Sequence, residues 1–423
     1  MRRRIARTGL WSVAIAALAL LAVGCAASGH GSGHATTTTR GRTHTAQTAA
    51  AVTIAPANGT MDADPSAGIT VTATRGTLRT VSVRSGGGAV PGNLTDGGKV
   101  WRSQWALNVS QDYTVTASAS GSGAVTATSR FRTLTPANTF RTEIFEGYKQ
   151  TYGVGMPVIL TFSQPITDKA AVERSLQLTT SAPVVGAWYW DGNQTLDFRP
   201  RDYWPAGTTV SFTGHLNGVQ GAPGMYGTHT LTQTFDIGAS LVAIGNTRTH
   251  RTQIYYNGKL RYNWPISSGK PGDATPDGSY LTIEKANPVR MIGPGYNLLV
   301  PWSVRFTFSG DYYHDAYWSV SEQGFENVSH GCVNLSPAHA KTYYKLAVPG
   351  DPITIVGSPK GGTWDNGWTE WFLSWRQYLR GSALHEAVMA GPDGSTFVSP
   401  ASVPASTGTA PLQTAPANNA AAR

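Results

Sequence analysis

Short runs in which hydrophobic and polar residues alternate recur along the first third of the chain. Between residues 51 and 137 these runs are Ile69–Ala73, Val81–Val83, Tyr113–Ala117 and Val125–Ala127. Alternation with a period of two is typical of β-strands that bury one face. Glycine-rich turns such as Gly86–Gly88 separate the runs. Many short strands with turn residues between them predict a β-sandwich over residues 51–137.

The same pattern continues over residues 138–240 and predicts a second β-sandwich. Its strand-like runs are Val158–Phe162, Leu176–Leu178, Trp188–Trp190, Thr195–Phe198 and Thr209–Phe212. The triplet Asp191–Asn193, with glycine at its centre, is typical of a hairpin turn. The segment around Tyr113 resembles the late strands of immunoglobulin-like modules. We therefore expect two immunoglobulin-like domains. The second would act as a spacer or a binding platform, and a scaffold that merely stiffens the chain is the alternative.

Residues 241–357 predict a third domain, in which the strands are joined by a helix. The strand-like runs are Leu241–Ile244, Gln253–Tyr256, Tyr280–Ile283 and Pro352–Val356. Ser336 is a suitable N-cap and Pro337 a suitable first residue for a helix that continues to Leu346. The whole chain is therefore expected to be mainly β.

The C-terminal region divides into two parts of different composition. Tryptophans and a leucine recur at helical spacing, which predicts a helical segment over residues 358–385 that docks on a core; they are Trp364, Trp368, Trp371, Trp375 and Leu379. Residues 386–423 become rich in Ala, Pro, Ser and Thr, and we expect them to form a disordered tail.

The first 24 residues have the features of an export signal. Arginines at positions 2–4 and 7 precede an apolar stretch from Leu10 to Val23, which is short for a membrane span. The segment Leu21–Cys25 resembles a bacterial lipobox, in which Cys25 would carry the lipid and anchor the protein to the membrane. Ordinary cleavage nearby is the alternative. Residues 25–50, which begin with the candidate lipidated cysteine, are expected to form a flexible tether.

Composition favours an exported protein over a helical cytosolic enzyme. Charged residues make up only 13% of the 423 residues, while Gly, Thr, Ser, Trp and Tyr are frequent. The formal net charge is +9, and removal of residues 1–24, which hold four arginines and no acid, would leave 29 basic against 24 acidic residues. A mildly basic exported protein suits an anionic cell wall or the outer face of the cytoplasmic membrane.

The sequence lacks the motifs that are expected for several classes of partner. There is no clustered basic helix and no RNA-binding aromatic motif, so we expect no nucleic-acid partner. Histidines such as His215, His229 and His250 lack the spacing of metal ligands. No glycine-rich loop precedes a helix in the arrangement that is typical of phosphate-binding sites. We therefore expect no metal and no cofactor.

The candidate chemistry is concentrated in the run Ser329–Asn334, which contains Cys332. This is the only cysteine besides Cys25, and an unpaired cysteine in an exported protein indicates a reactive role or a buried inert thiol. A thiol becomes a nucleophile when a neighbouring base or positive field yields the thiolate. Gly331 would let the backbone turn tightly, and Asn334 could bond neighbouring backbone.

Two histidines are candidates for the base. His314 lies 18 residues upstream of Cys332, and His330 lies two residues before it. Side chains at positions i and i+2 of an extended segment point the same way, so His330 could contact the thiol. The residues by themselves leave both alternatives open.

The arrangement of these residues resembles the signature of the L,D-transpeptidase catalytic domain. That family has a histidine, a spacer, and then a Ser/Thr-His-Gly-Cys run. Further segments also resemble the family: Trp264–Gly269, Thr275–Gly278, Ser319–Val320, Gln323–Gly324, Leu335–Pro337 and Gly350–Asp351. With the two sandwich domains and the Trp-rich end, the chain resembles the lipoprotein type of actinobacterial cell-wall enzymes.

The resemblance assigns the nucleophile and the base. Cys332 would form a thioester, and His314 rather than His330 would be the base. The family orients this histidine through the backbone carbonyl of the following residue, which here is Asp315. A carboxylate at that position could raise the pKa of the histidine or add a bond, or it could face solvent.

Other site residues follow from the same resemblance. Tyr296 matches a lid tyrosine that lines the oxyanion hole together with backbone amides near Gly331 and Cys332. Trp318 matches an aromatic residue of the substrate cleft, and packing in the core is its alternative. The remaining substrate-binding candidates belong to the motif itself and are Ser329, His330 and Asn334. Met291 lies near a lid position in a shortened loop, and no role is assigned to it.

The resemblance implies an acyl transfer in peptidoglycan biosynthesis, which contributes to cell-wall organisation and cell shape. Cys332 would attack the peptide stem and release D-alanine, and an amine of a second stem would take the acyl group in a 3-3 cross-link. Carbapenems would acylate the same cysteine. The alternatives are a carboxypeptidase, a ligase that attaches proteins to peptidoglycan, and a wall-binding module without activity.

Overall fold

The computed structural model describes residues 50–121, 123–293 and 295–406. The expected export signal, the lipidation site Cys25 and residues 26–49 of the expected tether lie outside these residues. Within the described residues, no helix is long and apolar enough to cross a membrane. As predicted, the chain is mainly β.

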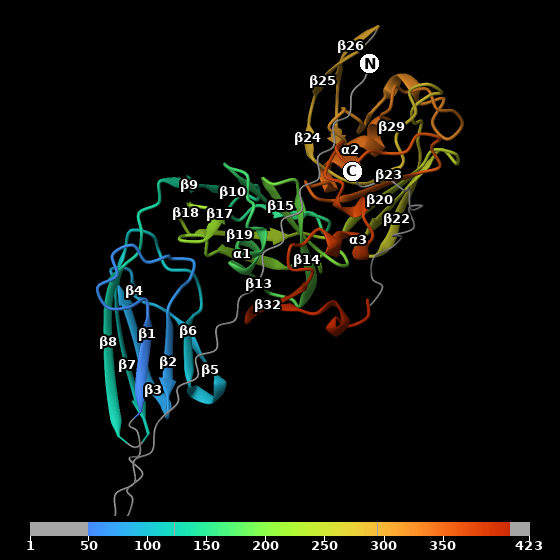
Figure 1. Cartoon of the computed structure of the whole chain (residues 1–423). Helices are drawn as coiled ribbons and strands as arrows, with labels where there is room; N and C mark the ends of the chain where they lie inside the picture. The colour runs from blue at the N-terminus through green and yellow to red at the C-terminus, as the bar shows by residue number, and fades with distance from the viewer. Residues whose placement is uncertain (1–49, 122, 294, 407–423) are drawn as a thin grey trace, which may run out of the picture. The chain divides into compact units, whose positions relative to one another are not determined.

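The first domain is a sandwich of two four-stranded sheets (Figure 1). One sheet has the order β1-β2-β6-β5, with the strands β1 (Ala51–Ala55), β2 (Thr70–Thr74), β6 (Val100–Ser103) and β5 (Gly92–Thr95). The other has the order β4-β3-β7-β8, with the strands β4 (Gly88–Ala89), β3 (Thr77–Ser85), β7 (Asp112–Ser120) and β8 (Ala124–Arg132). A single turn of 3-10 helix, Asp96–Gly98, joins β5 to β6.

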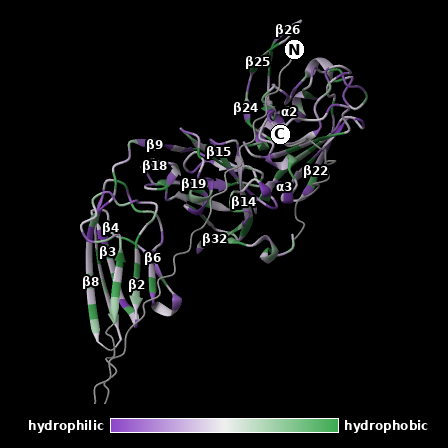
Figure 2. Ribbon diagram, in the orientation of Figure 1, coloured by the Kyte–Doolittle hydropathy of each residue, from purple (hydrophilic) through white to green (hydrophobic). Residues whose placement is uncertain are grey.

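The alternation seen in the sequence places the core of this first domain. Along β7, Tyr113, Val115, Ala117 and Ala119 are buried, whereas the residues between them are more exposed. Hydrophobic positions recur along these strands in Figure 2. Because successive side chains of a strand point to opposite faces, the pattern directs one row of each strand into the core.

The second domain pairs a six-stranded sheet with a four-stranded one. The first has the order β10-β12-β15-β14-β31-β32, with β10 (Thr142–Ile144), β12 (Val158–Phe162), β15 (Thr195–Pro200), β14 (Val184–Asp191), β31 (Ala387–Gly391) and β32 (Gly394–Val398). The second has the order β11-β19-β16-β13, with β11 (Thr151–Tyr152), β19 (Leu231–Ile237), β16 (Thr209–Gly214) and β13 (Leu176–Thr180). A small sheet and one helix complete it, with β9 (Asn138–Phe140), β17 (Gln220–Ala222), β18 (Met225–Gly227) and α1 (Lys169–Arg174).

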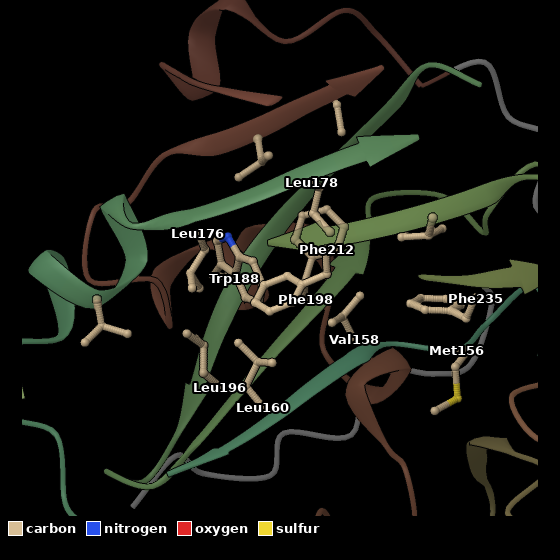
Figure 3. Close-up of a cluster of buried hydrophobic side chains, with 14 of the residues drawn as sticks. Met156, Val158, Leu160, Leu176, Leu178, Trp188, Leu196, Phe198, Phe212 and Phe235 are labelled. Atoms are coloured by element: carbon tan, nitrogen blue, oxygen red, sulfur yellow. The ribbon is translucent and has the colours of Figure 1, made fainter. Parts of the chain in front are cut away.

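Large aromatic side chains fill the space between the sheets of the second domain. Trp188 packs edge-on against Phe198 and Phe212, with ring centroids 5.2 and 6.3 Å away, and all three are buried. Figure 3 shows them between the strands, with Leu160 and Leu196 beside them. The hairpin predicted at Asp191–Asn193 joins β14 to β15.

The expectation of a disordered tail from residue 386 onwards is wrong for residues 387–398. These residues form β31 and β32, and β31 pairs antiparallel with β14. Val388 and Ala390 point into the core of the second domain, whereas Met389 is 39% exposed. Composition could not reveal this, because small apolar residues become a strand only where a sheet edge offers backbone partners.

The expectation of a Trp-rich helical segment over residues 358–385 is confirmed only in part. The segment contains a 3-10 turn, Glu370–Phe372, and the short helix α3 (Trp375–Arg380). Gly367, with φ of +140°, adopts a conformation that an α-helix excludes. The aromatic residues do reach a core, because Trp371 and Tyr378 enclose the guanidinium of Arg199 at 4.4 and 4.5 Å from their ring centroids.

The third domain contains a five-stranded sheet and a four-stranded sheet with the helix α2 (Pro337–Leu346). The first sheet has the order β22-β21-β20-β30-β23, with β22 (Lys259–Pro265), β21 (Arg251–Tyr256), β20 (Leu241–Asn246), β30 (Pro352–Val356) and β23 (Gly278–Leu281). The second has the order β24-β27-β28-β29, with β24 (Glu284–Ala286), β27 (Ser303–Arg305), β28 (Tyr312–Asp315) and β29 (Val333–Leu335). The strands β25 (Val289–Gly293) and β26 (Tyr296–Val300) form a separate hairpin. As predicted, Ser336 caps α2, accepting a hydrogen bond from the backbone of His339.

Adjacent residues of β31 provide a test of its placement. We expect Val388→Asp to lower the free energy of unfolding by about 2–5 kcal/mol, because it buries an unpaired carboxylate. Met389→Asp, one residue further on the exposed face, should change it by less than about 1 kcal/mol. Urea unfolding of the two variants measures both values. Equal effects would contradict the assignment of β31 to the sheet.

Candidate active site

Parallel pairing of β28 with β29 brings the sequence-predicted residues together. His314 lies opposite Asn334 in this pairing, and Cys332 immediately precedes β29. Val333 and Leu335, on the strand itself, are fully buried in the domain core. The 17 residues between His314 and Cys332 therefore form a connection whose two ends are fixed side by side.

Cys332 and His314 line one cavity of about 490 Å³. Of the other sequence-predicted residues, Tyr296, Trp318, Ser329, His330 and Asn334 also line it. The thiol of Cys332 is half-buried and donates to the carbonyl oxygen of Gly310 at an S–O distance of 3.7 Å. The sulfur of Cys332 thus belongs to a residue that lines a cavity large enough for part of a peptide.

His314 is held in one tautomer by the backbone. Its Nδ1 lies 2.8 Å from the carbonyl oxygen of Asp315, and a carbonyl can only accept, so Nδ1 carries the proton. Nε2 is therefore left as the basic atom. His314 is 3% exposed, and its ring centroid lies 5.9 Å from that of Trp318.

Burial sets the protonation states of the thiol and the imidazole. Burial lowers the pKa of His314 to about 4, against a smaller opposite effect of its bond to Asp315. Burial, and then the charge of Asp311, raises the pKa of Cys332 to about 12. Both shifts favour neutral groups, so at neutral pH the site holds a thiol beside a free base rather than a preformed ion pair.

The competing histidine, His330, has a different partner. Its Nε2 lies 2.9 Å from Nζ of Lys270, which is the donor, so the lone pair that would take a proton is engaged. Its ring lies beside that of Tyr296, with centroids 5.2 Å apart. This geometry favours His314 over His330 as the base.

Ser329 and Gly331 brace the loop that carries the cysteine. The hydroxyl of Ser329 donates to the carbonyl of Cys332 at 2.6 Å and accepts the N–H of Gly331 at 3.1 Å. Gly331 has φ of +132°, and a Cβ there would collide with the carboxylate of Asp311. The glycine is therefore needed for shape, while its N–H, expected to line an oxyanion hole, is already engaged.

The position of the Asp315 carboxylate decides between the roles that the sequence left open. Its side chain is buried rather than facing solvent, and the Oδ1 atom has no hydrogen-bond partner among the described residues. Burial raises the pKa of Asp315. Its carboxylate is not among the causes of the pKa shift of His314, which burial lowers and only the hydrogen bond to the backbone carbonyl of Asp315 opposes.

Asn334 and Trp318 take up different positions at the cavity. Asn334 is buried, and its Nδ2 donates to the hydroxyl of Ser319 at 2.9 Å, which ties β29 to the 3-10 turn Tyr317–Ser319. This favours a role in holding the loop over contact with a substrate. Trp318 is 44% exposed, so its ring can meet a ligand, and packing in the core is excluded.

The hairpin β25–β26 forms one wall of the cavity. Tyr296, Leu298 and Met291 line the cavity from this hairpin. Burial, and then the nearby Cys332, raises the pKa of Tyr296, so its hydroxyl keeps its proton. The sequence assigned no role to Met291, because the loop that carries it is shortened and its position could not be matched to the family.

Sequence reasoning also missed four polar residues around the site. Asp311, Lys270, Glu322 and Glu326 lie outside the motif, and nothing in their spacing marks them. Asp311 is fixed by the hydroxyls of Thr307 and Ser309, at 2.7 and 3.2 Å from its Oδ2. Among the described residues, no three His, Cys, Asp or Glu side chains are arranged to hold a metal ion.

Comparison with known proteins finds two family matches. Residues 60–220 match the bacterial Ig domain, and residues 241–355 match the L,D-transpeptidase catalytic domain. The second match spans the sheets that carry His314 and Cys332.

Curated relatives match much of the chain. L,D-transpeptidase 2 of Mycobacterium tuberculosis (strain CDC 1551 / Oshkosh) is 32% identical over 346 residues, which cover 78% of this chain and 85% of the relative. L,D-transpeptidase 1 of strain H37Rv is 39% identical over 215 residues, or 48% of this chain and 80% of the relative. A solved L,D-transpeptidase in complex with imipenem is 35% identical and covers 52% of this chain and all of that one, with a TM-score of 0.44.

The effect of Asp311 on the thiol can be tested directly. Asp311→Asn removes a negative charge that disfavours the thiolate, so we expect the pKa of Cys332 to fall by on the order of one pH unit. The pH dependence of alkylation by iodoacetamide measures it. Asp273→Asn, which also removes a nearby charge, serves as the control, since Asp273 does not contribute to the shift of the thiol. An unchanged profile for Asp311→Asn would contradict the argument.

Proposed function

This chain belongs to the L,D-transpeptidase family, and from that premise we propose that Cys332 and His314 carry out its acyl transfer. The family makes the chain an acyltransferase. The observation that supports these two residues is the pairing of β28 with β29, which fixes a free imidazole Nε2 and a thiol at the same cavity.

The first half-reaction forms a thioester. Nε2 of His314 takes the proton of the thiol as the sulfur of Cys332 attacks the carbonyl carbon of the third residue of a peptide stem. The tetrahedral intermediate then expels the amine of D-alanine, which receives the proton from His314. Because both groups are neutral at rest, proton transfer accompanies the attack rather than preceding it.

The second half-reaction transfers the acyl group to an amine of another stem. This amine attacks the thioester carbonyl and gives its proton to His314, and the thiol leaves with that proton. The product is a 3-3 cross-link between the third residues of two stems. The protonated hydroxyl of Tyr296 is a suitable donor to the oxyanion of each intermediate.

The hairpin β25–β26 also bears on the choice of acceptor. Apolar side chains from it, Met291 and Leu298, line the cavity beside Tyr296 and would restrict the entry of water to the thioester. This favours an amine acceptor over hydrolysis. The presence of both a thiol and a base at one cavity argues against a binding module without activity.

Carbapenems are the proposed inhibitors. A similar L,D-transpeptidase is solved in complex with imipenem, and L,D-transpeptidase 3 of Mycobacterium tuberculosis with a faropenem-derived adduct. The same cysteine nucleophile would open a β-lactam ring in this chain and retain the acyl group. The setting we propose is the outer face of the cytoplasmic membrane and the cell wall, with the chain anchored by lipid at Cys25.

Substitution of the two catalytic residues tests the mechanism. We expect Cys332→Ala to form no covalent adduct with meropenem, and His314→Ala to acylate about 100-fold or more slowly, as loss of a general base implies. His330→Ala should retain acylation within about threefold. Mass spectrometry of the intact protein over time follows the adduct. Undiminished acylation of His314→Ala with loss in His330→Ala would assign the base to His330.

The products of turnover test the choice of acceptor. With a D-alanine-terminated tetrapeptide, we expect the wild-type chain to release D-alanine and to yield 3-3 dimers that mass spectrometry can sequence. Tripeptide without dimer would identify a carboxypeptidase. No release of D-alanine would contradict the proposed reaction.

The pH dependence of acylation tests the protonation of His314. Because its pKa is lowered to about 4, the imidazole stays unprotonated above that value. The acylation rate should therefore remain level as the pH falls from 8 to about 5 and halve only near pH 4. Stopped-flow measurement of β-lactam consumption provides the profile. A midpoint near the ordinary histidine pKa of about 6.5 would contradict a buried, neutral base.

A further inference from the structure

The charges that line the catalytic cavity differ in sign from the chain as a whole. The chain has a formal net charge of +9, yet the cavity is lined by the carboxylates of Glu322 and Glu326 and, among the described residues, by no lysine or arginine. Lys270 is not among the lining residues, and its Nζ contacts Nε2 of His330 at 2.9 Å and a carboxylate oxygen of Asp273 at 3.5 Å. A cleft of this kind attracts a cation.

The two glutamates are placed on the same side of one turn. The backbone carbonyl of Glu322 accepts the N–H of Phe325 and that of Glu326, both at 2.9 Å. In such a turn, side chains at i and i+4 are neighbours, and two like charges there repel each other. No ion pair to either carboxylate is found within the described residues.

Hydrogen-bond acceptors are in excess along the same segment. Oε1 of Glu322 accepts from the hydroxyl of Ser321 at 2.9 Å, but Oε2 is buried without a partner among the described residues. Oδ1 of Asp315 and Oε1 of Gln323 are also buried and unpartnered among the described residues, but these two side chains do not line the cavity. A buried acceptor without a donor is costly, and a cationic donor is the partner that would satisfy a carboxylate best.

We propose that Glu322 and Glu326 form a subsite that binds the side-chain ammonium of the diamino acid in the donor stem. This inference rests on the proposed function, which places that residue at Cys332 as the acyl donor. A 3-3 cross-link requires a third residue that bears an amine, so the donor residue itself carries the cation. The two glutamates then select stems whose third-residue amine is free.

The charge of the pair identifies which amine it binds. An aliphatic amine with a pKa near 10.4 is an ammonium at neutral pH, and carboxylates stabilise that form further. The attacking amine of the acceptor must be neutral to use its lone pair. The subsite therefore suits the donor, where a persistent positive charge orients the carbonyl toward the thiol without entering the reaction.

Equilibrium binding tests the subsite without turnover. The probes are a D-alanine-terminated tetrapeptide with a free third-residue amine and the same peptide with that amine N-acetylated. In the full chain carrying Cys332→Ala, we expect the free amine to bind about tenfold more tightly, as a charge-assisted hydrogen bond implies. Adding Glu322→Gln and Glu326→Gln should reduce this preference to about twofold or less. Calorimetry measures the four affinities.

A matched control separates the subsite from overall charge. Glu143→Gln with Asp393→Asn removes the same two charges at exposed positions of the second domain and should leave the tenfold preference intact. Loss of preference in the cleft variant alone supports the proposal. Equal binding of the two peptides before substitution, or an unchanged preference after it, overturns it. Release of D-alanine by the wild-type chain is measured separately, so a failure of the transpeptidase reaction is distinguished from a failure of the subsite.

Discussion

The structure of the site depends on the parallel pairing of two short strands, β28 and β29. Neither strand is long, and each would be unstable alone, but all their residues except Tyr312 are buried, and both strands contact α2. The pairing places His314 opposite Asn334, and Cys332 is the residue immediately before β29. Because the register of a buried strand is fixed by which face is apolar, the same core residues that hold the domain together align the thiol with its base.

Burial has a chemical consequence as well as a structural one. It lowers the pKa of His314 and raises that of Cys332, so the site at rest contains two neutral groups. A thiol in that state is protected from non-specific alkylation and oxidation, since the thiolate is the reactive species. Activation then depends on a substrate that fills the cavity and brings a carbonyl to the sulfur. Asp311 is fixed by two hydroxyls beside Gly331, and its negative charge further disfavours the thiolate of Cys332.

The cavity combines apolar and acidic walls in a chain with a basic surplus. The hairpin β25–β26 supplies the apolar side chains and the hydroxyl of Tyr296, and the turn beginning at Glu322 supplies two carboxylates. A positive overall charge favours approach to an anionic polymer, whereas the local negative charge favours one end of a peptide stem. In the proposed function, attraction to the wall and choice of stem would thus depend on different parts of the protein.

The sequence by itself determined the fold class, the strands of the sandwiches, the cap of α2 and the residues of the motif. Alternation with a period of two is a local property, and a Ser-His-Gly-Cys run carries its chemistry in adjacent positions. Local composition failed for residues 387–398, which became strands because β14 offered them an edge. Helical spacing predicted too long a helix in the Trp-rich segment, where the α-helix is limited to Trp375–Arg380 and Trp371 packs on a core outside it. Only the tertiary structure decided that His330 is engaged by Lys270 and that Asp315 is buried. It alone also showed that Glu322 and Glu326 line the catalytic cavity. These outcomes depend on burial and on contacts between residues distant in the chain, and neither is encoded in the spacing of a motif.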